Sequence, residues 1–370
     1  MESAQYDCTV DGTSREEWSD ILLTFRDAFI YQSWSYGVVR WGERCLSHLV
    51  LKREGEIVAA VQVRLVRIPV LGRGMAYVFR GPMWRRRGNA DDPEVYSQIF
   101  RALRNEYAVR RGLFLRVLSC EEDDGDEMLK TRVAGEGFRW FETSYRTLMM
   151  DLAHSAEDLR NSMRNTWRQS LAKAERGNLE IEEGTSAELF EECLAVYGEM
   201  HARKGFAEFV DMEEYGEIQK DLPGNLKMQI MVCREEGTPV AALAWSVIGE
   251  TCMPILAATG NRGTHLNASH LLFWNMILTL KDSGCRALNL GGINRARNPG
   301  GYTWKTGLSG KLGREVGLIG QFDACDRAVS MWLVRMGDGV IALRKRLKRR
   351  KGLRIARRLA GLWAGRKGSR

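Results

Sequence analysis

The pattern of apolar and polar residues repeats along this chain. Residues 49–65 read LVLKREGEIVAAVQVRL, and residues 230–247 read IMVCREEGTPVAALAWSV. Each stretch has an apolar run, a polar turn with glycine, a Val-Ala-Ala segment and a second apolar run. Strand-forming residues on both sides of a polar glycine turn are typical of a β-hairpin. The sequence therefore predicts two equivalent hairpins.

A helix and then a strand follow each predicted hairpin. Apolar residues recur at helical spacing over 93–111 and over 266–283, which predicts two helices. Short apolar runs at 113–118 and 286–290 come after them and are typical of strands. Because the order and the spacing of the elements both match, the sequence predicts an internal duplication.

The duplication divides the chain into two copies of one α+β domain. We place the first over 1–151 and the second over 152–328, followed by a helical tail over 329–370. A chain of 370 residues is too long for one ordinary domain and suits two. Its 44% apolar and 28% charged residues are those of a globular protein and exclude collagen, disorder and a disulfide framework.

The positive charge of the chain is concentrated at one end. The formal net charge is +8, but residues 344–370 hold 13 Lys and Arg and no Asp or Glu. Removing them from the 55 basic residues leaves 42 against 47 acidic residues, so the body is mildly acidic. This basic amphipathic tail suits an anionic membrane surface or an RNA, and a disordered end without a partner is the third alternative.

The sequence gives no sign of export, membrane insertion or metal binding. The eight cysteines are scattered, and no two form a Cys-x-x-Cys pair. No apolar run approaches the roughly 18 residues that a membrane span needs. We therefore expect a cytoplasmic protein without a metal or bound cofactor, with the inner face of the membrane as a candidate contact of the tail.

A basic segment joins the two predicted domains. Residues 159–178 read LRNSMRNTWRQSLAKAERGN, and one helix over this stretch would bring Arg164, Arg168 and Lys173 near one another. The ordinary interpretation is a solvated helix face. Trp167 among these cations favours another interpretation, a surface for phosphates and sugars, because aromatic rings and guanidinium groups recur in such sites.

The most unusual composition lies in LGGINRARNPGGYTWKTGLSGK, residues 290–311, where six of 22 residues are glycine. The two glycines at its start follow a predicted strand and allow a ligand to approach the backbone closely. The Asn-Pro-Gly at 298–300 indicates a turn, and residues 302–305 read as a strand-like segment from which Lys305 projects. Taken alone, these residues favour a surface lysine at a sheet edge.

Four segments together resemble the FemAB-type aminoacyltransferases, tandem GNAT-fold relatives of the peptidoglycan interpeptide-bridge enzymes. AFIYQSWSYG, residues 28–37, is similar to the family's Gln-Ser-x-x-(Trp/Tyr) start, and VFRGPMW, residues 78–84, to its Arg-Gly-Pro. RNTWRQSLAKAE, residues 164–175, is similar to its Trp-Arg-x-x-Leu-x-Lys-Ala helix. Residues 288–310 are similar to its Asp-x-Gly-Gly, Asn-Pro-Gly and Phe-Lys-x-x-Phe-Gly-Gly run. The resemblance covers most of residues 28–325.

The chain departs from the family pattern at several places. Trp304 stands where Phe is usual, Asn289 where Asp is common, and Ser309-Gly310 where the family has Gly-Gly. The long inserted coiled-coil hairpin of the larger bridge enzymes is missing. The chain therefore looks like the compact branch of the family, which includes members outside cell-wall synthesis, so the acceptor stays open.

The resemblance implies an activity and a set of site residues. It implies transfer of an aminoacyl group from aminoacyl-tRNA to the amine of a peptide, nucleotide-sugar or lipid-linked precursor, with an amide bond as product. Lys305 would stabilise the oxyanion or the leaving ribose hydroxyl. Substrate contacts are expected from Arg80, Arg164, Trp167, Arg168, Lys173, Gly291, Gly292, Asn298, Tyr302 and Trp304.

Two alternatives to this activity remain. The first is an acyl-CoA-dependent N-acyltransferase of a polysaccharide or natural-product pathway. Residues 261–270, NRGTHLNASH, match the pyrophosphate-binding loop of ordinary GNAT enzymes only in part, so we regard acyl-CoA as the less favoured donor. The second is a non-catalytic protein that docks tRNA or a membrane on the same fold.

Overall fold

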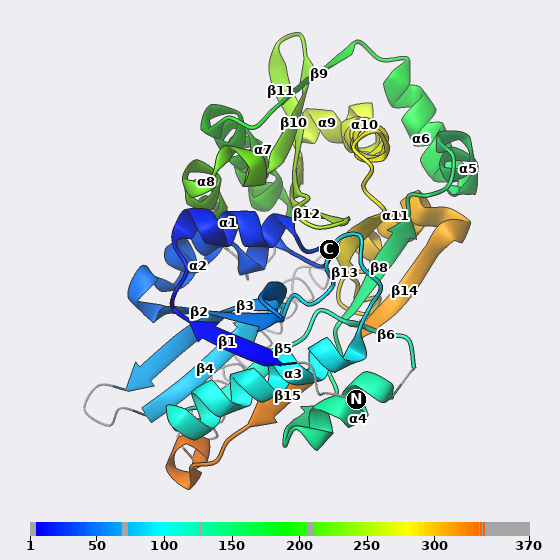
Figure 1. Cartoon of the computed structure of the whole chain (residues 1–370). Coiled ribbons are helices and arrows are strands. Elements are labelled where there is room, and N and C mark those ends of the chain that lie inside the picture. Colours follow the sequence, from blue (N-terminus) through cyan, green and yellow to red (C-terminus); the bar gives the residue numbers. More distant parts are fainter. Residues whose placement is uncertain are drawn as a thin grey trace, which may run out of the picture.

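The protein is described from a computed structural model, which covers residues 5–68, 73–125, 127–205, 211–332, 334 and 336. Two mixed β-sheets with helices packed around them form an α+β structure (Figure 1). The fold class therefore agrees with the sequence prediction. Of the helical tail expected over 329–370, residues 329–332, 334 and 336 are described and are helical, whereas 337–370, with all the basic residues of 344–370, lie outside the described residues.

The first sheet has seven strands. In spatial order they are β1 (Tyr6–Val10), β2 (Leu46–Arg53), β3 (Glu56–Ile68), β4 (Arg73–Phe79), β5 (Phe114–Leu118), β15 (Gln321–Ala324) and β7 (Arg139–Phe141). Strands β4 and β5 are parallel and the other neighbours are antiparallel. Between β4 and β5 the chain forms α3 (Pro93–Leu103), which continues as a π-helix (Arg104–Arg110). The helix expected over 93–111 is confirmed.

The second sheet has eight strands. In spatial order they are β9 (Leu179–Gly184), β10 (Gln229–Glu235), β11 (Thr238–Ser246), β12 (Thr251–Thr259), β13 (Ala287–Gly292), β8 (Arg146–Asp151), β14 (Gly313–Leu318) and β6 (Glu122–Asp123). Only β12 and β13 are parallel. The helix expected over 266–283 is confirmed as α10 (Ala268–Asp282). A shorter helix, α9 (Asn261–Leu266), precedes it, and Asn267 between the two has a left-handed backbone with φ of 57°.

The two sheets repeat one plan and exchange strands. Both predicted hairpins are present, as β2–β3 and β10–β11, each followed by a third antiparallel strand, a helix and a parallel strand. Strand β15, from the C-terminal part of the chain, lies between β5 and β7 of the first sheet. Strand β8, which ends at the expected boundary, lies between β13 and β14 of the second. The exact division at 151 stays a prediction.

The remaining α-helices cover the sheets. They are α1 (Arg15–Leu23), α2 (Trp34–Trp41), α4 (Met128–Gly135), α5 (Ala156–Ser162), α6 (Asn165–Glu175), α7 (Ala187–Lys204), α8 (Met212–Asp221) and α11 (Pro299–Ser309). Helices α7 and α8 lie over α1 and α2 in Figure 1. One apolar core includes Trp18 and Phe25 from the first copy and Phe190 and Ile230 from the second, so the two copies pack as one body.

Three sequence expectations about local structure are wrong. The basic stretch 159–178 is not one helix, because Met163 and Arg164 are extended and separate α5 from α6. Residues 302–305 are not strand-like and belong to α11. Asn298 caps this helix by accepting the Gly301 N–H at 2.9 Å, with a proline at the first helical position. The Asn-Pro-Gly that indicated a turn is therefore a helix start.

Within the described ranges, no helix is long and apolar enough to cross a membrane. Over the same residues, no three His, Cys, Asp or Glu side chains are grouped as metal ligands would be.

Candidate active site between two diverging strands

The main cavity of the second copy opens between β12 and β13. These parallel strands pair only at their beginnings, where Thr251 lies opposite Ala287 and Cys252 opposite Leu288. The corresponding strands of the first sheet, β4 and β5, stay paired over five residues. Beyond Cys252 the strands separate, and a cavity of about 580 Å³ fills the space beside them. This volume is in the range of small-molecule sites.

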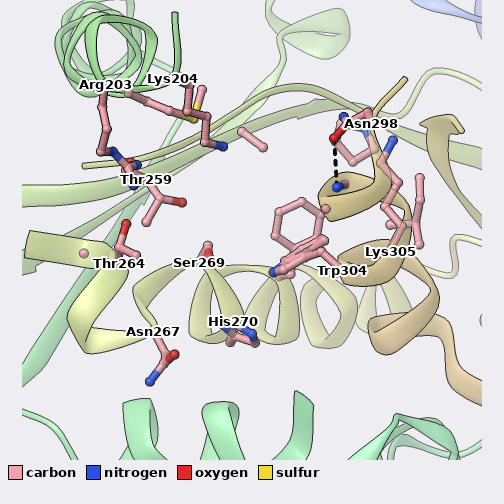
Figure 2. A pocket seen from close by; sticks show the side chains of 18 of the residues that line it. Arg203, Lys204, Thr259, Thr264, Asn267, Ser269, His270, Asn298, Trp304 and Lys305 are labelled. Atoms are coloured by element: carbon pink, nitrogen blue, oxygen red, sulfur yellow. Dashed lines mark hydrogen bonds between the residues drawn. The ribbon is translucent and has the colours of Figure 1, made fainter. Parts of the chain in front are cut away.

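Five parts of the chain form the cavity wall (Figure 2). They are the end of α7, strand β12, the α9–α10 region, the end of β13 and the start of α11. Phe273 and Trp304, with ring centroids 4.6 Å apart, supply an apolar side. The polar lining comes from Arg203, Lys204, Thr259, Thr264, Asn267, Ser269, His270, Asn298 and Lys305.

Lys305 is held at this cavity by α11 and by the end of β13. Its Nζ donates a hydrogen bond to the Gly292 carbonyl oxygen at 2.9 Å. Withdrawal from water lowers the pKa of Lys305 from 10.5 to about 8, because burial disfavours the charged ammonium. The structure therefore places here a lysine with a lowered pKa that is hydrogen-bonded to a backbone carbonyl.

Gly291 and Gly292 shape the strand end that holds this lysine. The pairing of β13 with β8 shifts register between Asn289 and Gly292. Gly291 has a φ of 77°, and its N–H donates to the Asn289 side-chain oxygen at 2.9 Å. The Thr147 hydroxyl donates to the same oxygen. The two glycines lie outside the cavity lining and direct a carbonyl at Lys305, a role that the sequence did not indicate.

Substitution of Gly291 tests this arrangement. We expect Gly291→Ala to lower the free energy of unfolding by about 1–2 kcal/mol, because a side chain disfavours left-handed backbone. Gly198→Ala is the matched control, since Gly198 is exposed within α7 with open space around it and the same change there should stabilise by about 1 kcal/mol. Urea unfolding measures both, and equal effects at the two positions would contradict the explanation.

A second hollow of about 520 Å³ adjoins the first. Its walls include Arg164 and Trp167, and it shares Trp304 and His270 with the main cavity. The ring centroids of Trp167 and His270 are 4.6 Å apart, and those of Trp167 and Trp304 are 5.8 Å apart. Trp167 is only 4% exposed. Its ring is therefore almost wholly packed into this wall, and Arg164 is a cation that borders the hollow.

The other expected site residues lie outside both hollows. Arg168 donates to the Asn161 carbonyl and Lys173 to that of His265, both at the exposed surface. The Tyr302 hydroxyl donates a hydrogen bond to the Glu315 carboxylate at 2.6 Å.

Arg80 approaches the site from the first copy without lining it. Its guanidinium lies 4.5 Å from the centre of the Tyr145 ring. That ring packs against Gly292, where an added Cβ would come within 3.1 Å of it. Arg80 therefore connects to the carbonyl that holds Lys305 through one aromatic side chain.

The sequence analysis missed several residues of the cavity wall. Arg203, Lys204 and Phe273 line it, and none was proposed. From the partly matching loop 261–270, Thr264 and His270 line it, whereas Arg262 points away and pairs with Glu235. The sequence signal that could have indicated Arg203 and Lys204 is that two cations are adjacent at the end of a helix.

Comparisons with known proteins agree with this fold. Residues 161–306 match the family model of the acetyltransferase (GNAT) domain. The structure of FemX superposes with a TM-score of 0.73 at 12% identity, covering 89% of this chain and 99% of that one. A conserved protein of Bacteroides thetaiotaomicron gives a TM-score of 0.57 at 12% identity, with 86% and 99% coverage. No curated protein matches the chain at a significant level.

A third structure is the C-terminal domain of a putative lysylphosphatidylglycerol synthetase from Agrobacterium fabrum. Its TM-score is 0.51 at 16% identity, with 87% of this chain and 95% of that chain covered. These likenesses define the class: the chain is a GNAT-fold protein, similar to acyltransferases of that fold. More particularly, its two sheets repeat one plan, and the whole fold is similar to that of FemX.

Proposed function

We propose that the protein is an acyltransferase that forms an amide bond by moving an aminoacyl group from aminoacyl-tRNA to an amine. The observation that carries this proposal is Lys305, which borders a cavity between two diverging strands and is held by a backbone carbonyl. The FemX-like architecture and the GNAT domain match support acyl transfer. The motifs that resemble FemAB-type enzymes support the aminoacyl donor.

The reaction requires a site that orients both substrates and supplies positive charge to the oxyanion. The acceptor nitrogen attacks the ester carbonyl carbon, a tetrahedral oxyanion forms, and the bond to the ribose oxygen then breaks. The proton that the nitrogen loses balances the charge on the leaving oxygen, which departs as a hydroxyl. Protonated Lys305 stabilises the negative oxygen, a contribution of roughly 3–4 kcal/mol for one well-placed donor. Holding both substrates in the cavity supplies the orientation term.

The second hollow suits the acceptor. Arg164 gives it a positive charge, and Trp304 separates it from the main cavity. A peptide, nucleotide-sugar or lipid-linked precursor with an amine would bring an anionic group to Arg164 and its amine toward Lys305.

Acyl-CoA is the alternative donor. Thr264 and Asn267, from the region where ordinary GNAT enzymes bind pyrophosphate, line the main cavity. The GNAT domain match also includes this region.

A donor test separates the two. Purified protein is offered labelled aminoacyl-tRNAs or labelled acyl-CoAs, together with an extract of amine-bearing precursors. RNase-sensitive transfer to a product that is not RNA supports the proposal, and transfer from acyl-CoA alone selects the alternative. If neither donor supports transfer, both proposed donor functions are excluded.

The pH dependence of the reaction tests the charge on Lys305. A lysine with a pKa of about 8 is cationic below that pH and neutral above it. If the cation stabilises the oxyanion, kcat/KM should fall as the pH rises through 8. In Lys305→Arg, whose guanidinium stays protonated, the fall should be absent. A wild-type rate that instead rises through pH 8 in a Lys305-dependent way would assign Lys305 as a base.

A further inference from the structure

Two neighbouring cations stand across the main cavity from Lys305. Arg203 and Lys204 belong to the last turn of α7, are exposed, and both line the cavity (Figure 2). Arg203 donates to the Thr259 carbonyl oxygen at 2.6 Å, which ties it to β12. Among the described residues, no carboxylate lines this cavity or pairs with either cation. The cavity therefore carries a net positive charge at this border.

Several other exposed arginines of this copy have carboxylate partners, among them Arg314 with Glu122. Arg262, one turn beyond β12, forms two hydrogen bonds of 2.6 Å with Glu235. The pKa of Lys204 is lowered, because its partial withdrawal from water and the charge of the neighbouring Arg203 both disfavour the ammonium form. A cation at a helix C-terminus is favoured by the helix dipole. The dipole does not account for two adjacent cations that border a cavity, whereas a bound anion would relieve their repulsion.

Other lining residues carry hydroxyls that suit a group with several oxygens. Thr259 lies beside Arg203, and Ser269 lies across the cavity on α10 (Figure 2). A carboxylate has two oxygens, and one guanidinium group is able to donate a hydrogen bond to each of them. A phosphate has additional oxygens, so it is able to contact the cations and the hydroxyls at the same time.

We propose that Arg203 and Lys204 form a phosphate subsite for the carrier of the acyl donor. This inference rests on the proposed function, because it assigns the main cavity to the donor. Phosphate is the chemistry that both candidate carriers share, since the terminal nucleotides of a tRNA and CoA each carry it. With the phosphates held at the exposed border, the acyl ester or thioester would extend inward toward Lys305.

Binding to the full chain tests the subsite without requiring turnover. The probes are cytidylyl-adenosine, which reproduces the end of a tRNA, and desulfo-CoA, which reproduces the other carrier. We expect Arg203→Gln/Lys204→Gln to weaken binding of one probe or both by about 10- to 100-fold in calorimetric titration. Arg262→Gln is the matched control, because its arginine is exposed, lies nearby and is paired outside the cavity. It should leave both affinities unchanged.

Each result of these titrations has a different meaning for the subsite. Loss of affinity for only one probe supports the subsite and identifies its carrier. Equal affinities in wild type and the double variant overturn the subsite. It is also overturned if neither probe binds and malonate, a dicarboxylate, binds in a way that depends on the two cations. Circular dichroism of the double variant excludes unfolding as the cause.

Kinetics separate this inference from the proposed function. The double variant should raise KM for the donor and leave kcat within about twofold, since the phosphates lie away from the reacting carbonyl. A fall in kcat at unchanged KM contradicts a binding subsite. If wild type binds the probes but transfers no acyl group, the proposed function fails and the subsite stands. If Lys305-dependent transfer occurs and binding is indifferent to both cations, the subsite alone fails.

Discussion

Replacing Lys305 by methionine should lower kcat about 10²–10³-fold and leave the fold intact. The rate effect is the expected cost of removing one donor from the developing oxyanion. The fold should persist, because the hydrogen bond that Lys305 makes is to the exposed Gly292 carbonyl, which water is able to satisfy instead. Single-turnover measurements with saturating donor give the rate, and urea unfolding gives the stability.

Lys311→Met is the control for this experiment. Lys311 is an exposed lysine in the turn after α11, outside both hollows, so its loss should change neither rate nor stability. Near-normal turnover in Lys305→Met would remove the central argument for the proposed function.

Trp167→Ala should cost about 3–5 kcal/mol of the free energy of unfolding in the absence of any ligand. This is the range for truncating a large buried aromatic side chain. Trp167 is 4% exposed, and its ring fills the space beside Gly307 of α11, where an added Cβ would lie 3.0 Å from it. Trp167→Phe, which keeps most of the volume, should lose less than half as much. Equilibrium urea unfolding measures all three proteins.

This substitution also decides between two roles for the tryptophan. If Trp167 mainly stacked on a bound sugar, the ligand-free alanine variant would unfold at the wild-type urea concentration. If it is a packing residue, α11 loses support and activity falls together with stability. An unchanged stability would therefore restore the binding role that the cations around it indicated in the sequence.

The sequence predicted those parts of the fold that depend on local patterning. The two hairpins follow from strand-forming residues around glycine turns, and α3 from apolar residues at every fourth position. The start of α11 was misread because glycine and proline suggested a turn, although Asn298 followed by proline is also a helix start. The short α9 was not predicted, because its six residues are too few to show a helical apolar period.

The candidate site was only partly accessible from the sequence. Lys305 was found through a resemblance, because a lone lysine beside glycines has no distinctive pattern of its own. The cavity was not foreseen, because it depends on where β12 stops pairing with β13, a property of packing between distant segments. Arg203 and Lys204 come from the end of α7, and only the folded chain brings them to the cavity that Lys305 borders.

The exchange of strands between the sheets bears on how the two copies changed after duplication. A chain cut after residue 151 would lose β15 from the middle of its sheet, between β5 and β7. The complementary half would lose β8 from between β13 and β14. Neither copy is therefore a module that recombination was able to replace by itself, since each replacement would have left unpaired backbone inside a sheet. Changes in one copy are therefore constrained by the other, although their parallel strands differ, separating in the second copy and staying paired in the first.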